Sequence, residues 1–288
     1  MTIEEKIKEL REQLNNHNYN YYVLDNATIS DFDFDRTLKA LEKLEKENPI
    51  YFNSNSPTQR VGGTVTKNFN TIVHKNRMYS LDNSYSKEDL FDWEKRIEKV
   101  LGVSELEFTC ELKFDGASIN LTYENGQFIK AVTRGDGFQG DEVTNNIKTI
   151  RSIPLSIKEE FISNFEMRGE IVLPIDGFIK MNEKRILNGE EVYRNPRNTA
   201  SGSLKLQDSG EVAKRPLDCL LYQVVTEERK YKTHFESLEN ARKAGFKVPK
   251  TITLAKSIDA VFDFVNYWDV KRNDLPYETD GIVIKVNN

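Results

Sequence analysis

Apolar residues recur every three or four positions in several stretches of the chain, which predicts amphipathic helices. The first stretch, residues 2–14, places isoleucines and leucines on one face, at positions 3, 7, 10 and 14, and glutamates in its first turn, where the helix dipole favours them. The same spacing predicts further helices over residues 31–47, 87–100, 141–150, 175–187, 234–244 and 258–271.

Shorter runs in which apolar and polar residues alternate predict strands. Two of these runs, residues 117–123 and 127–133, flank Asn125-Gly126, which is a strong signal for a two-residue hairpin turn. We therefore expect these two strands to be antiparallel. Further strands are predicted over residues 106–112, 164–173, 217–226 and 282–286. Together the helices and strands predict an α+β fold.

A glycine-rich segment follows the predicted hairpin. Its sequence, Gly-Asp-Gly-Phe-Gln-Gly over residues 135–140, matches the dinucleotide fingerprint G-x-G-x-x-G. That fingerprint belongs to a parallel βαβ unit with an apolar crossover helix. Here the preceding strand is the return arm of a hairpin, and the helix that follows is polar. We therefore reject a Rossmann fold and expect these glycines to let the backbone turn sharply beside Arg134.

Two polar stretches interrupt the pattern. Residues 53–70 contain Pro57 and Gly62-Gly63 and predict a linker, so we expect the chain to divide into residues 1–66 and residues 67–288. Residues 193–214 show no clear period and carry basic side chains among Asn, Ser and Gly. This second stretch is either a solvated loop or a loop that contacts phosphate, and the sequence Asn-Pro-Arg-Asn within it favours the second interpretation.

The composition indicates a soluble globular protein. Of the 288 residues, 38% are hydrophobic and 30% are charged, and no run is long and apolar enough to span a bilayer. Cys110 and Cys219 are isolated, so neither a zinc site nor a disulfide framework is indicated. We expect a cytoplasmic protein with no membrane partner. The net charge of −5 argues against the whole chain being a strong independent nucleic-acid binder, but leaves room for a local basic face.

Lys113 is the first candidate for chemistry. It follows a predicted strand and precedes the turn signal Asp115-Gly116, so its amine can point into a cleft from the rim of a sheet. A lysine amine is a nucleophile only when deprotonated, and neighbouring cations or a metal would favour the neutral amine, whereas Glu111 and Asp115 alone would oppose it. The alternative is a surface lysine beside an ordinary turn, and Lys-x-Asp-Gly alone does not decide between the two.

Aromatic and acidic residues cluster around the start of the second predicted helix. Tyr21 and Tyr22 precede it, and the i, i+4 spacing of Asp31 and Asp35 puts both carboxylates on one helical face beside Phe34. Such a set could clamp a flat, positively charged ring by stacking and cation–π attraction. The alternative, which composition alone favours, is that the tyrosines pack between two helices and the aspartates form a solvated first turn.

Several short motifs follow one another along the chain: Glu-Leu-Lys113-x-Asp-Gly, Thr133-Arg-Gly-Asp-Gly137, Arg168-Gly-Glu170, Asn195-Pro-Arg-Asn198, Gly202-Ser-Leu-Lys205 and Asp280-Gly-x-Val-Ile-Lys285. This ordered set resembles the adenylation module of the NAD⁺-dependent bacterial DNA ligases. Residues 21–35 resemble the segment of that family that binds nicotinamide mononucleotide (NMN). The resemblance implies a small helical N-terminal subdomain followed by an antiparallel-sheet nucleotidyltransferase domain of the ATP-grasp-like ligase type.

The resemblance also implies a reaction. Lys113 would attack the adenylyl phosphorus of NAD⁺, release NMN and become a lysine–AMP phosphoramidate. Glu170 would lie near Mg²⁺, while Lys285 and Arg197 would offset the charge that builds on the phosphate. Asp115, within the lysine motif, completes the implied catalytic set.

The other implied roles are contacts to NAD⁺. Tyr222 would stack on adenine, Glu111 with the pair Ser80-Leu81 would contact the adenosine, and Arg134 would hold the ribose and phosphate region. The residues that would grip the leaving NMN are Tyr21, Tyr22, Asp31, Phe34 and Asp35. The implied NAD⁺ site is completed by Phe32, Asp33, Leu112, Glu170, Lys205, Val283 and Lys285.

Three features depart from the pattern of the family. Phe34 stands where tyrosine is usual, and Lys205 stands where arginine is common, which keeps the charge without bidentate geometry. The chain also stops at Asn288, before the further catalytic lysine and the DNA-binding domains of the family. We therefore expect a fragment, monomeric, of an enzyme whose partner is nicked duplex DNA in replication and repair.

Two other classes of protein stay open. The first is an ATP- or GTP-dependent ligase or capping-type nucleotidyltransferase, and residues 21–35 speak against it. The second is a non-catalytic NAD-binding module, and the intact Lys113 with its acidic and basic neighbours speaks against that.

Overall fold

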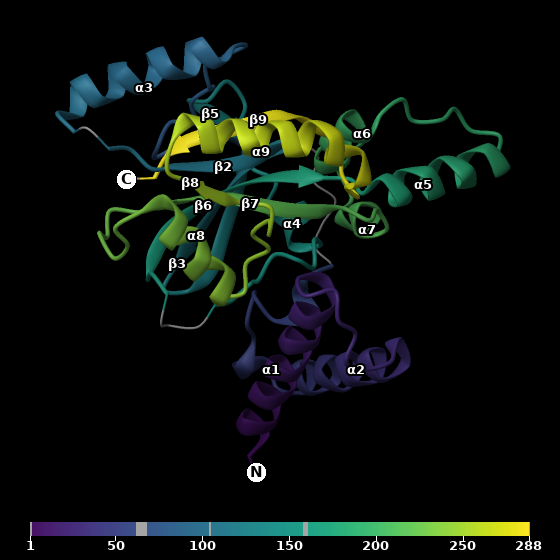
Figure 1. Cartoon of the computed structure of the whole chain (residues 1–288). Helices are drawn as coiled ribbons and strands as arrows, with labels where there is room; N and C mark the ends of the chain where they lie inside the picture. The colour runs from purple at the N-terminus through teal and green to yellow at the C-terminus, as the bar shows by residue number, and fades with distance from the viewer. Residues whose placement is uncertain (1, 62–67, 104, 158–160, 288) are drawn as a thin grey trace.

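The computed structural model describes residues 2–61, 68–103, 105–157 and 161–287. Figure 1 shows a pair of N-terminal helices beneath a larger body that is built on β-sheets. The chain boundary expected between residues 66 and 67, with the Gly62-Gly63 pair, lies outside the described residues. Within the described ranges, no helix is both long enough and apolar enough to cross a lipid bilayer.

The N-terminal pair consists of α1 (Ile3–Tyr22) and α2 (Asp31–Glu47), which pack on each other through Ile7, Leu10, Leu14 and Leu41. The helix α1 continues to Tyr22 instead of ending at residue 14. The reason is that the buried stripe is extended by Asn18, a polar residue that interrupts the apolar pattern but is only 4% exposed. Two short 3₁₀ helices follow, η1 (Pro49–Tyr51) and η2 (Pro57–Gln59).

The described part of the polar stretch after α2 is packed in part against the larger body. Asn55 donates a hydrogen bond of 3.1 Å to the carbonyl of Phe128. Arg60 donates to three carbonyl groups of the larger body, those of Lys148, Ile150 and Ile153, and burial lowers the pKa of its guanidinium to about 10. Asn55 and Arg60 therefore attach this stretch to the larger body by donating to its backbone carbonyls, while residues 53, 54, 59 and 61 remain exposed.

A four-stranded antiparallel sheet has the order β4-β3-β6-β7, formed by β4 (Gln127–Thr133), β3 (Ala117–Glu124), β6 (Asn164–Val172) and β7 (Asp218–Val225). The hairpin between β3 and β4 turns at Asn125 and Gly126, which both have positive φ. This confirms the antiparallel hairpin that the Asn-Gly pair predicts. The core beneath this sheet includes Ile119, Tyr123 and Phe165 and is covered in part by α8 (His234–Lys243).

A second, three-stranded sheet has the order β8-β2-β9, formed by β8 (Thr253–Ala255), β2 (Phe108–Phe114) and β9 (Thr279–Val286). On one face Phe108, Cys110 and Leu112 pack beneath α3 (Lys87–Leu101) and α9 (Ile258–Lys271), which the short helix η3 (Arg272–Asp274) follows. Side chains alternate along a strand, so Glu111 and Lys113 lie on the opposite face, which looks toward the four-stranded sheet.

A two-stranded sheet of β1 (Thr71–Val73) and β5 (Gln139–Asp141) lies beside the end of β4. The glycine-rich segment therefore leads into a strand and not into a phosphate-binding helix. The helix predicted over residues 141–150 is shorter, α4 (Thr144–Lys148), because Asp141 pairs with Thr71 in the sheet.

The stretch predicted as a loop, residues 193–214, contains α6 (Pro196–Leu204) and α7 (Ser209–Ala213), so the loop prediction is wrong. The buried positions of α6 are taken by Thr199, Ala200 and Ser203 as well as Leu204, so no apolar period marks the helix. Asn195 caps α6, and Pro196 occupies its first turn. The helix α5 (Ile175–Leu187) precedes this stretch and has its predicted bounds.

Candidate active site

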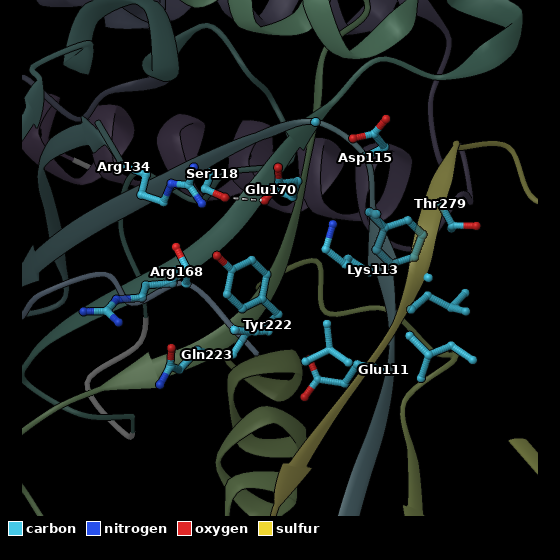
Figure 2. A pocket seen from close by; sticks show the side chains of 18 of the residues that line it. Glu111, Lys113, Asp115, Ser118, Arg134, Arg168, Glu170, Tyr222, Gln223 and Thr279 are labelled. Carbon is cyan, nitrogen blue, oxygen red and sulfur yellow. Dashed lines mark hydrogen bonds between the residues drawn. The ribbon is translucent and has the colours of Figure 1, made fainter. Parts of the chain in front are cut away.

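A cleft of about 1520 Å³ opens between the two larger sheets. It is lined by residues from β2 and β9 on one side, from β3, β6 and β7 on the other, and by the segment from Met78 to Ser86. Figure 2 shows Lys113 reaching into the cleft from β2, opposite Glu170 and Tyr222 of the four-stranded sheet. The cleft therefore collects polar side chains from two sheets that have separate cores.

Lys113 lies at the end of β2, and its Nζ donates a hydrogen bond of 2.6 Å to Oδ2 of Asp280. The hydrogen bond and the charge of Lys113 hold the pKa of the Asp280 carboxyl below its ordinary value. Both side chains are about half exposed, so the amine can be reached from the cleft. The glycine at position 116 is required because a Cβ there would lie 2.2 Å from the carbonyl oxygen of Ile171 on β6.

Glu170 faces Lys113 from β6. Its Oε2 accepts a hydrogen bond of 2.8 Å from Ser118, its neighbour on β3. Burial raises the pKa of Glu170 to about 7, although the positive charges of Lys113, Arg134 and Arg197 act in the opposite direction. A further cation that approaches this carboxyl group would favour its ionised form and lower its pKa.

A buried ion pair forms the side of the cleft nearest to β7. Lys285 of β9 donates to Glu111 Oε2 at 2.8 Å and to the carbonyl of Tyr222 at 3.0 Å, and its ammonium lies 5.1 Å from the Tyr222 ring centroid. Burial lowers the pKa of Lys285, while Glu111 acts to raise it. Burial would raise the pKa of Glu111, but Lys285 and His234 outweigh that effect and hold it below its ordinary value. The pair is therefore charged, and the charges compensate each other.

Two further ion pairs involve basic residues of α6. Arg197 in the first turn of α6 lies 3.0 Å from Asp115, and Lys205 at its C-terminal end lies 2.8 Å from Asp141. All four side chains line the cleft. Asp115 is thus held by an arginine and not by Lys113.

The other cleft residues expected from the sequence are placed as follows. Ser80 and Leu81 are exposed at its edge, in a segment that Arg168 pins by donating to the carbonyls of Asn76 and Arg77. Arg134 is exposed at the end of the β3–β4 hairpin. Residues that line the cleft from β2 and β9 include Leu112, whose side chain belongs mainly to the core under α9, and Val283, which pairs with Glu111.

The structure does not bring the N-terminal candidates into this cleft, because its lining begins at Thr71. Tyr22 and Phe34 instead face Arg151, which follows α4. The Arg151 guanidinium lies 5.7 Å and 5.6 Å from the two ring centroids and donates a hydrogen bond of 3.2 Å to the Tyr22 hydroxyl. The remaining members of the set lie near the end of α1 and the start of α2. Tyr21, Asp31, Phe32 and Asp35 are exposed, and Asp33 pairs with Arg36 and the cap residue Ser30.

The described residues contain no group of three or more His, Cys, Asp or Glu side chains placed to hold a metal ion. Magnesium usually keeps several waters and is bound through one or two carboxylates together with substrate phosphates. Glu170, with its raised pKa and its position across from Lys113, fits that mode as a single carboxylate. The chain alone does not form a complete metal cage within the described ranges.

Three residues that interact at these sites had no role in the sequence-based set: Asp280, His234 and Arg151. Asp280 begins the motif that ends at Lys285, so the motif could have identified it as a site residue. The contact of Asp280 with Lys113, however, depends on strand register. His234 follows Thr233, a helix cap, and nothing in that local pattern points to Glu111. Arg151 lies in a turn after α4 with no motif of its own.

Comparisons with known proteins agree with this architecture. Residues 66–288 match the family model described as NAD-dependent DNA ligase adenylation domain, and residues 1–62 match that of the DNA ligase-like, N-terminal NAD+-binding domain. Proteins named DNA ligase from Flavobacterium johnsoniae and Flavobacterium psychrophilum are each 66% identical to the chain over 288 residues. The DNA ligase of Bacteroides fragilis is 49% identical over 289 residues. In each case the whole chain is covered but only 43% of the relative, so the chain spans less than half the length of these proteins.

Proposed function

The chain belongs to the NAD-dependent DNA ligases, as their N-terminal NAD⁺-binding and adenylation domains, and we propose that Lys113 is the residue that takes AMP from NAD⁺. The observation that carries this proposal is the position of the Lys113 amine, at the end of β2 inside a cleft that also holds Glu170 and Tyr222. The cleft therefore contains a nucleophile, a carboxylate suited to a phosphate-bound cation, and an aromatic ring on which a base could stack.

The reaction begins with loss of a proton from the Lys113 ammonium. The carboxylate of Asp280, 2.6 Å away, favours the ammonium form, so this proton leaves to solvent when the pair opens, and the nearby cations Arg134 and Arg197 favour the neutral amine. The nitrogen lone pair then forms an N–P bond with the adenylyl phosphorus, while the P–O bond to NMN breaks and NMN departs with that electron pair as a phosphate. The product is a lysine–AMP phosphoramidate.

Charge on the phosphate is balanced by side chains that surround Lys113. Arg197 and Arg134 are two of the exposed cations on the cleft wall, and Arg197 is held in place by Asp115. Such preorganised charges stabilise a phosphoryl transition state without reorganising during the reaction. When bound, Mg²⁺ would be held by Glu170 and a phosphate oxygen and would supply further compensation of negative charge.

The geometry supports a different role for Lys285 from the one implied by the resemblance. Its ammonium is already balanced by Glu111 and lies against the backbone of Tyr222, so it is poorly suited to offset charge on the phosphate. A donor and an acceptor side by side, next to an aromatic face, match the hydrogen-bonding edge of adenine. We therefore assign base recognition to Glu111 and Lys285, with Tyr222 as the stacking ring.

The N-terminal helices would act on the other half of NAD⁺. Nicotinamide in NAD⁺ is a flat, positively charged ring, and Tyr22 and Phe34 already face a flat cation, the Arg151 guanidinium. This contact supports the same two rings as the binding site for the pyridinium. Asp31 and Asp35, which lie near Phe34 in the sequence, would compensate the charge of the pyridinium and accept hydrogen bonds from the hydroxyl groups of NMN. Because these residues lie outside the cleft, NMN binding requires α1 and α2 to move toward Lys113.

We further propose that the adenylate serves to seal nicks in duplex DNA in the full-length protein, because the relatives are named DNA ligase. We also propose that the protein acts in the cytoplasm and as a monomer. The experiment that tests the adenylation proposal compares NAD⁺ with ATP as AMP donors in the presence of Mg²⁺. NAD⁺ should yield protein-bound AMP and one equivalent of NMN, and ATP should yield neither. Adenylation by ATP, or NAD⁺ binding without any adduct, would support one of the two alternative classes.

A further inference from the structure

His234 is a largely buried side chain that contacts Glu111 and Lys285, the pair to which we assign base recognition. Its Nε2 lies 2.8 Å from Glu111 Oε1, and the two side chains are only 13% and 5% exposed. The same nitrogen lies 3.4 Å from the Lys285 ammonium. Glu111 therefore has one oxygen on His234 and the other on Lys285, and all three groups come from different elements: β2, β9 and α8.

The protonation of His234 at Nε2 follows from its partners. Glu111 is ionised, since its pKa is held below the ordinary value, and a carboxylate only accepts hydrogen bonds. Nε2 must therefore carry a hydrogen and donate it to Oε1. The close approach of Nε2 and the Lys285 ammonium is then a contact between two donors that converge on one carboxylate.

The backbone around His234 is hydrogen-bonded to Asn287, which directly follows β9, the strand that carries Lys285. The His234 amide donates to the carbonyl of Asn287 at 3.0 Å, and the next amide, of Phe235, donates to the Asn287 side chain at 2.9 Å. Thr233 caps the helix by accepting a hydrogen bond of 3.1 Å from the Glu236 amide. The imidazole is therefore mounted on a fixed helix start, at a set distance from β9.

We propose that His234 is a positioning residue that holds Glu111 in the orientation that selects adenine over 6-oxopurines. This inference rests on the proposed base-recognition role of Glu111 and Lys285. Adenine presents a donor at its 6-amino group and an acceptor at N1, which match a carboxylate and an ammonium side by side. Hypoxanthine and guanine present the reverse order, an acceptor at O6 and a donor at N1.

A 6-oxopurine could be accommodated only if the acceptor and the donor exchanged places. Rotation of the Glu111 side chain, together with movement of the flexible Lys285 side chain, would allow that exchange. The hydrogen bond from His234 to Oε1 opposes this rotation by fixing one carboxylate oxygen. A site with fixed polar groups rejects the wrong hydrogen-bonding pattern strongly, since the buried groups would be left unpaired. Removal of the imidazole should therefore weaken selectivity as well as binding.

The test measures transfer from NAD⁺ and from nicotinamide hypoxanthine dinucleotide to the protein, as the ratio of the two kcat/KM values for nucleotidylation. His234→Gln keeps an amide nitrogen at about the reach of Nε2, whereas His234→Asn has the same group on a shorter stem. Thr233→Ala is the matched control, because it weakens the same helix start and leaves the imidazole in place.

The ratio in favour of NAD⁺ should fall at least about tenfold in His234→Asn, should stay near the wild-type value in His234→Gln, and should be unchanged in Thr233→Ala. An unchanged ratio in His234→Asn, with wild-type protein that is adenylated by NAD⁺, would overturn the role of His234 alone. Wild-type protein that forms no adduct with NAD⁺ would instead overturn the proposed function. A purely structural role predicts equal losses with both dinucleotides, which also contradicts the inference.

Discussion

The Nζ atom of Lys113 and the Oδ2 atom of Asp280 are 2.6 Å apart, although the two residues are 167 positions apart in the sequence. The contact joins the end of β2 to the start of β9 across a register shift between Leu112 and Phe114. It holds the proposed nucleophile in place before substrate binds. Because both side chains are about half exposed, we expect this pair to contribute little to stability, at most about 1 kcal/mol.

The first prediction concerns the titration of Asp280. Lys113 lowers the pKa of this carboxyl by a hydrogen bond and by its charge, so Lys113→Met should move the pKa back up toward the ordinary aspartate value. NMR titration of the Asp280 carboxyl carbon measures this shift. Lys205→Met removes a cleft lysine that pairs with Asp141 and should leave Asp280 unchanged. Identical Asp280 titration in wild type and Lys113→Met would disprove the pairing.

The second prediction concerns the acidic face of α2. Asp31→Ala and Asp35→Ala should each slow adenylation by NAD⁺ at least about tenfold, because they remove groups proposed to grip NMN. Both residues are exposed, so thermal midpoints should change only modestly, apart from the dipole contribution of Asp31 in the first turn. Glu42→Ala, an exposed acid further along the same helix, is the control and should react as wild type. Normal rates in both aspartate variants would return this face to a purely structural role.

The third prediction concerns Arg151. Its guanidinium lies against the Tyr22 and Phe34 rings that we propose bind nicotinamide, so it competes with NAD⁺ for them. This contact therefore favours the arrangement in which α1 and α2 lie away from the cleft. Arg151→Ala should lower the KM for NAD⁺ in adenylation by about two- to fivefold, as expected for loss of its exposed cation–π contacts with the two rings and its hydrogen bond to Tyr22. Lys130→Ala removes one positive charge from β4 and should leave the KM unchanged. A higher KM in Arg151→Ala would mean that Arg151 assists binding instead.

The fourth prediction concerns pH and stability in metal-free protein. Burial raises the pKa of Glu170 from 4.5 to about 7, so between these pH values the folded protein holds a proton that the unfolded chain releases. The free energy of unfolding contributed by Glu170 is therefore greatest below about pH 4.5 and is lost as the pH rises to about 7. Glu170→Gln removes this dependence and should gain stability relative to wild type over that interval, by about 1–3 kcal/mol.

Urea denaturation at about pH 4.5 and about pH 7.5 measures this difference directly. The amide that Glu170→Gln introduces keeps an oxygen that can accept the hydrogen bond from Ser118, so only the titration is removed. If the stability difference between the two proteins is the same at both pH values, the Glu170 carboxyl does not titrate near neutrality.

Much of the sheet architecture could be predicted because its signals are local. The Asn125-Gly126 pair determines the β3–β4 hairpin, and the apolar alternation of β6 and β7 is long enough to stand out. The helix α6 could not be predicted in the same way, since its buried face is made of Thr199, Ala200 and Ser203 instead of leucines. Its caps, Asn195 and Pro196, were the only local signal, and they resemble ordinary turn residues.

The cleft was predictable to the extent that its residues belong to motifs. Lys113 and Glu170 were identified from motifs, and the structure places both in one cleft. Contacts such as Lys113–Asp280 and Glu111–His234 depend on strand register and on the docking of α8, which the motifs do not encode. The position of Tyr22 and Phe34 outside the cleft depends on how two separately packed bodies meet. Local sequence patterns carry no information about such an arrangement.

The most direct test of the account is the intact mass of the protein after incubation with NAD⁺ and Mg²⁺, followed by mapping of the modified peptide. Wild-type protein should gain the mass of one AMP on the peptide that contains Lys113, because its amine lies in the cleft among the groups that we propose bind the nucleotide. Lys113→Ala should gain none, while Lys205→Ala, which removes another cleft lysine, should still be modified. An adduct on a different residue, or one that persists in Lys113→Ala, would contradict the central claim.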